Sequence, residues 1–80
     1  MSRAENLGQR EELRIRRKNI EAEITSHCES IRHSLPLTAE PVDIDAEYIM
    51  RLSIRLNELK QELKGVVRKI ENLERDLGIR

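Results

Sequence analysis

The chain has 80 residues, which is enough for one domain at most. Charged residues make up 38% of it, with 15 basic and 15 acidic side chains, and Tyr48 is its one aromatic residue. This composition excludes a core of large side chains and favours long, solvent-exposed helices with a narrow apolar face. The zero net charge argues against general nucleic-acid binding, which depends on an excess of positive charge.

Two further features of the composition concern the compartment. Cys28 is the only cysteine, so an intrachain disulfide is impossible, which fits a reducing cytoplasm. No apolar run approaches the roughly 20 residues that a membrane span needs. We therefore expect a cytoplasmic protein without a membrane-spanning segment.

The first predicted helix covers residues 3–34. One of its faces carries six apolar residues, namely Leu13, Ile20, Ile24, Cys28, Ile31 and Leu35. Ser2 and Glu5 have the spacing of a capping box, which satisfies free N–H groups at the start of a helix. Pro36 is expected to end the helix, because proline disfavours helical geometry in the residue before it.

A loop over residues 35–44 follows, and it leads into an acidic tip. Residues 35–47 contain four acidic residues and no Lys or Arg, and the four are Glu40, Asp43, Asp45 and Glu47. Asp45 has the position of a helix N-cap, and Glu47 suits the positive end of the helix dipole. Glu40 and Asp43 exceed what helix initiation needs. These acidic residues could enter a basic cleft of a partner or help to hold a hard divalent cation.

The second predicted helix covers residues 45–77 and has the clearest pattern in the chain. Apolar residues recur at alternating steps of three and four, the a and d positions of a heptad repeat. These residues are Ile49, Leu52, Leu56, Leu59, Leu63, Val66, Ile70, Leu73 and Leu77. Gly78 comes directly afterwards, where a left-handed helix cap is expected.

Two helices of similar length joined by a short loop predict an all-α fold, an antiparallel coiled-coil hairpin of one domain over residues 1–80. The register agrees, because apolar residues of the two halves pair when their numbers sum to about 80. One such interface buries little apolar area. Four apolar residues lie away from it and indicate a homodimeric four-helix bundle: Ile15, Met50, Ile54 and Val67.

Other residues suggest weaker alternatives. A basic run in the first helix offers contacts for RNA, as in a Rop-like RNA-binding dimer, although a solvated, salt-bridged face explains it better. This run consists of Arg14, Arg16, Arg17 and Lys18. His27 and His33 each lie four residues from a glutamate, but the two pairs point in different directions, so we predict no metal site. No nucleophile with a neighbouring base and no phosphate-binding loop is present, so we predict a non-enzymatic protein without a cofactor, a protein–protein interaction or structural module.

The tripeptide Ala46-Glu47-Tyr48 resembles the start of the second helix in Gre-type transcript cleavage factors. A heptad helix of similar length follows it here, ending in KIENLERDL. In that family an N-terminal coiled-coil hairpin enters the secondary channel of bacterial RNA polymerase. The resemblance implies a transcription regulator whose tip acids approach the polymerase magnesium site. Aligning the tripeptide places the family's acidic positions on Pro41 and Ile44, so Asp43 and Asp45 would take that role.

Overall fold

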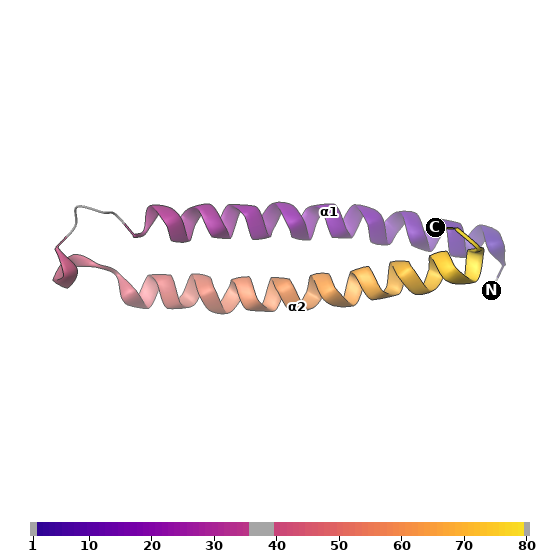
Figure 1. Ribbon diagram of the computed structural model, residues 1–80. Helices are drawn as coiled ribbons and strands as arrows, with labels where there is room; N and C mark the ends of the chain where they lie inside the picture. The colour runs from indigo at the N-terminus through magenta and orange to yellow at the C-terminus, as the bar shows by residue number, and fades with distance from the viewer. Residues whose placement is uncertain (1, 36–39, 80) are drawn as a thin grey trace.

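The computed structural model describes residues 2–35 and 40–79, which form two long helices packed against each other and one short helical turn. Helix α1 runs over Arg3–His33, the 3-10 turn η1 over Pro41–Asp43 and helix α2 over Ala46–Leu77. The two helices lie side by side and run in opposite directions, with η1 at one end (Figure 1). The molecule measures 59 by 16 by 15 Å. Within the described residues there is no strand.

The ends of α1 follow local hydrogen-bonding rules. Ser2 is the N-cap, and its Oγ accepts a hydrogen bond from the N–H of Glu5 at 3.2 Å, as the predicted capping box requires. At the other end the N–H of Ser34 donates to the carbonyl of Ser30 at 3.0 Å. The predicted role of Pro36 in ending the helix concerns a residue outside the described part of the chain.

Both ends of α2 are also capped. Asp45 is the N-cap, and Gly78 adopts a left-handed conformation with φ of 72°, as predicted. The N–H of Ile79 donates to the carbonyl of Glu74 at 2.8 Å, and the N–H of Gly78 donates to that of Arg75 at 3.1 Å. These two bonds form a Schellman motif and satisfy carbonyls that the helix end would otherwise leave free.

The core is one strip between the helices. Among the described residues six side chains are buried: Leu13, Ile20, Leu59, Val66, Ile70 and Leu77. All but Leu77 form one cluster, with the partly buried Ile24, Leu63 and Leu73 packed against it. This cluster contains the pairs Leu13–Val66 and Ile20–Leu59, which the register sum of about 80 predicted. Leu59, 1% exposed, is the most deeply buried residue of the core.

Burial is uneven along the hairpin. Among the described residues, no side chain between residues 21 and 58 is buried, so the buried ones lie from the middle of the hairpin to the end that carries the two termini. The apolar positions toward the loop are half-buried or exposed. There, the half-buried residues include His27 and Cys28 of α1 and Ser34, which directly follows this helix. These residues offer less apolar area than leucine, so they cover α2 less completely. Neither helix, within residues 2–35 and 40–79, is long and apolar enough to cross a membrane.

Candidate functional site

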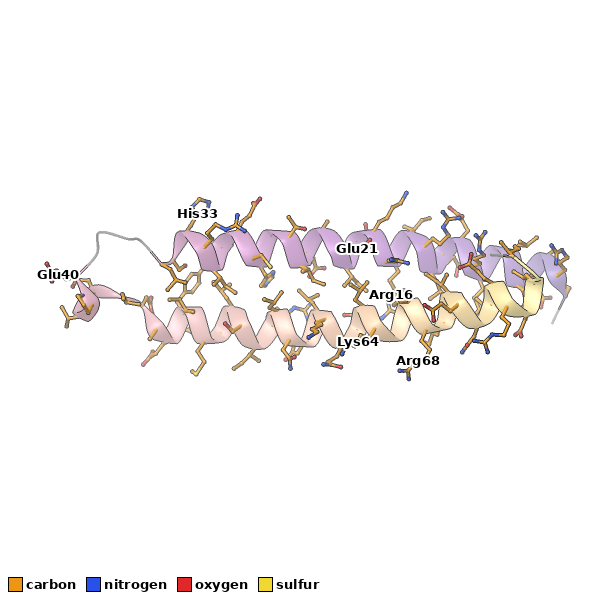
Figure 2. The ribbon with its side chains drawn as sticks, viewed as in Figure 1. Arg16, Glu21, His33, Glu40, Lys64 and Arg68 are labelled. Carbon is orange, nitrogen blue, oxygen red and sulfur yellow. The ribbon has the colours of Figure 1, made fainter. Side chains whose placement is uncertain are left out.

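The tip of the hairpin is a short turn that exposes Val42 between two acidic residues, Glu40 and Asp43. In η1 the N–H of Asp43 donates to the carbonyl of Glu40 at 2.9 Å, and the N–H of Ile44 donates to that of Pro41 at 3.3 Å. These bonds fix the backbone around Val42, whose side chain is 89% exposed. Glu40 lies at the extreme end of the molecule (Figure 2). The sequence prediction had identified the acids here but not Val42.

The four tip acids divide into two pairs with different local roles. The Asp45 carboxylate accepts a hydrogen bond from the N–H of Tyr48 at 3.0 Å, and Glu47 lies in the first turn of α2. These two residues serve the helix start. Glu40 and Asp43 are exposed, and their carboxylates take part in no ion pair or hydrogen bond with another described residue. They are therefore the acids available to a partner.

The tip acids are not arranged as a metal site. Over the described part of the chain, no group of three or more His, Cys, Asp or Glu side chains is placed to hold a metal ion. His27 is used locally instead, with Nδ1 lying 3.0 Å from the carbonyl of Glu23. The tip therefore presents separate charges and not a set of converging oxygen ligands.

The basic run of α1 is divided between two sides of the hairpin. Arg16 crosses to α2 and pairs with Glu62 at 2.7 Å, whereas Arg17 pairs with Glu21 on its own helix at 3.6 Å. Arg14 and Lys18 are exposed and form no ion pair within the described residues. The four residues proposed for RNA contact therefore do not form one surface.

Three of the four residues proposed for RNA contact line one groove together with Arg10, which the sequence prediction did not identify. The groove has a volume of about 330 Å³ and the buried Ile70 at its floor, and two glutamates also line it, Glu21 and Glu74. Its basic lining residues are Arg10, Arg14, Arg17 and Lys18. We call this the basic groove. The sequence does contain a signal for Arg10, which lies four residues before Arg14 and seven before Arg17. Residues at these spacings share a helix face.

The apolar residues predicted to mediate self-association do not form one patch. Met50 and Ile54 are 57% and 54% exposed and lie one turn apart on α2. Val67 is half-buried in a second groove, which also has Lys64 and Arg68 in its wall. Ile15 is equally exposed but lies on α1, two residues from the buried Leu13 and so about 200° around the helix. A single flat interface can cover the α2 residues but not Ile15 as well.

Comparison with known proteins found no matching family model, no matching curated protein and no matching solved structure.

Proposed function

We propose that this chain is a non-enzymatic helical-hairpin module of the cytoplasm that works by binding protein surfaces, beginning with a second copy of itself in a coiled-coil four-helix bundle. One observation carries this proposal. The hairpin buries six apolar side chains along one strip, while Met50 and Ile54 remain more than half exposed on α2. A soluble chain rarely leaves such side chains uncovered together without an interaction that uses them.

Self-association is favoured by the shape of the hairpin. Two helices in contact along one strip leave both broad faces of the pair in water. Packing a second hairpin against one face removes the half-buried positions near the loop from solvent as well. Burying one large apolar side chain contributes about 1.5–3 kcal/mol. A dimer in the micromolar range, about −8 kcal/mol, requires several such residues on each copy, because association also costs translational and rotational freedom.

Sedimentation equilibrium tests this part of the proposal. We expect a mass close to twice that of the chain at micromolar concentration, falling toward the monomer mass on dilution. Replacing Met50 and Ile54 together by Ser should shift the equilibrium toward monomer while leaving the helical content of the chain intact. A mass equal to one chain throughout the accessible concentration range would overturn self-association.

A second candidate function follows from the tip. The exposed Val42 lies between Glu40 and Asp43, so the tip offers an apolar contact with negative charge on both sides. A basic cleft lined with apolar residues would complement it. The resemblance to Gre-type factors suggests the secondary channel of RNA polymerase as such a cleft.

Transcription assays with purified polymerase test the second candidate. Asp43→Asn combined with Asp45→Asn should abolish any effect of the protein, because both changes remove charge and keep the side-chain size. Asn is also a good N-cap, so α2 should keep its start. If the wild-type protein neither binds polymerase nor changes transcript cleavage, this candidate function is wrong.

A further inference from the structure

Opposite charges are separated along the hairpin. The acidic tip, residues 40–47, contains four carboxylates and no basic side chain. Arg14 and Lys18 of the basic groove form no ion pair within the described residues. Each of these two regions therefore has charge available for a partner of the opposite sign.

The tip cannot reach the basic groove of its own chain. The ion pairs Arg16–Glu62 and Glu23–Arg55 join residues whose numbers sum to 78, so Lys18 lies level with residue 60 or 61 of α2. Helix α2 begins at Ala46, about fifteen residues earlier, which corresponds to about 22 Å at the helical rise. This separation exceeds the reach of any side chain. The two charged regions can meet only between copies.

The two broad faces of the hairpin differ. One is crossed by Arg16–Glu62 and Glu23–Arg55, and the other by Arg10–Glu74, because Arg10 and Arg16 are six residues apart and thus about 240° around α1. The basic groove includes Arg10 and Glu74 and so lies on the second face. We call this the groove face.

Met50, an exposed apolar residue near the tip, lies toward the groove face of α2. Val67 lies seven residues before Glu74, so it is on the same side of α2. Lys64 lines the second groove together with Val67. Met50 lies fourteen residues before Lys64, which is two heptads and thus the same side of α2. Cys28 lies eighteen residues after Arg10, five full turns, so it is on the groove face of α1.

We infer that two hairpins pair antiparallel through their groove faces, with the acidic tip of each copy on the basic groove of the other. This inference deepens the proposed self-association and rests on it. Residue 52 lies midway between Asp43 and residue 61, so the two-fold axis passes at the level of Leu52. An interface around such an axis is the same patch on both copies.

The apolar residues satisfy this symmetry without having been used to place the axis. Met50 and Ile54 lie two residues before and two after Leu52. An antiparallel two-fold axis at Leu52 therefore sets Met50 of one copy level with Ile54 of the second copy, and the reverse. By the same register sum of 78, Cys28 lies level with residue 50, so each thiol lies about two residues from the level of the axis. A parallel dimer would instead place four acids beside four acids, which is repulsive.

Charge reversal tests the arrangement. Lys18→Glu and Asp43→Lys should each raise the dissociation constant of the dimer about tenfold or more at low salt, because each places like charges together. The combined variant Lys18→Glu/Asp43→Lys should return it to within about threefold of wild type, since the reversed charges meet again. Both side chains are exposed, so circular dichroism should show unchanged helicity.

Lys69 supplies the matched control. It is exposed on α2 and lies seven residues after Glu62, so it is on the face opposite to the groove face. Lys69→Glu combined with Asp43→Lys should therefore not restore the dimer. Restoration by Lys69→Glu in place of Lys18→Glu would overturn the assignment of the face.

The native Cys28 gives an independent readout, because it is the only thiol in the chain. A short bismaleimide should link two wild-type chains at Cys28, and Cys28→Ser should abolish the link. A dimer in sedimentation that neither cross-links at Cys28 nor regains affinity in the double charge reversal would refute this arrangement and leave self-association standing. A chain that stays monomeric would refute the self-association itself.

Discussion

The guanidinium of Arg10 donates two hydrogen bonds to one carboxylate oxygen of Glu74, from Nε at 3.2 Å and from Nη2 at 2.8 Å. The two side chains are 19% and 25% exposed, so water screens the pair only partly. The contact joins α1 to α2 beside the buried Ile70. Among the ion pairs of the described residues it has the least exposed side chains.

A double-mutant cycle with Arg10→Gln and Glu74→Gln should give a coupling free energy of about 1 kcal/mol. The exposed pair Arg55–Glu58, at 3.4 Å within α2, is the control, and its coupling should be about 0.3 kcal/mol. Urea unfolding followed by circular dichroism at one fixed protein concentration measures both. Equal coupling in the two cycles would show that partial burial of Arg10 and Glu74 adds nothing.

Truncation of the most buried side chain should be the most costly core change. Leu59→Ala should lower the free energy of unfolding by about 3 kcal/mol, because it removes buried apolar area and leaves a cavity. Leu56→Ala should cost clearly less, since Leu56 holds a heptad position but is only half-buried. The same urea titrations compare them. A greater loss for Leu56→Ala would contradict the link between depth of burial in the hairpin and the cost of truncation.

Gly65 inside α2 and Gly78 directly after it should respond in opposite directions to the same substitution. Gly65 is exposed inside the helix, and an added Cβ meets no atom within 4 Å, so Gly65→Ala should stabilise the chain by about 1 kcal/mol. Gly78 has a φ of 72°, so Gly78→Ala should destabilise it by about 1 kcal/mol. Thermal unfolding of the two variants beside wild type measures the contrast. A stabilising Gly78→Ala would mean that the helix end does not keep its left-handed cap.

The sequence was sufficient to predict the helices, because α2 carries an uninterrupted heptad and both helices begin at residues with a capping side chain. It could not predict how burial is distributed along the strip. Periodicity gives the direction of a side chain, whereas the depth of burial depends on what faces it. Leu56 and Leu59 are equivalent in the heptad pattern, yet only Leu59 is buried.

The candidate sites show the same limit. Local spacing predicted the N-cap role of Asp45, and the pair Arg17–Glu21 also follows an i,i+4 spacing. It could not predict that Arg16 would pair with Glu62, 46 residues away, because such contacts depend on the packing of the two helices. The basic groove is thus lined by Arg10 and not by Arg16. Adding Arg10 to Arg14, Arg17 and Lys18 required the tertiary structure.

The two aspartates of the tip should separate stability from binding. Asp45→Ala removes the acceptor of the Tyr48 N–H and should cost about 1 kcal/mol of stability. Asp43→Ala removes a carboxylate without a partner among the described residues, so the free energy of unfolding should change little while self-association weakens. Urea unfolding and sedimentation of both variants give the two quantities. A large loss of stability in Asp43→Ala would make that carboxylate part of the fold, and the tip would then retain only Glu40 as an acid free for a partner.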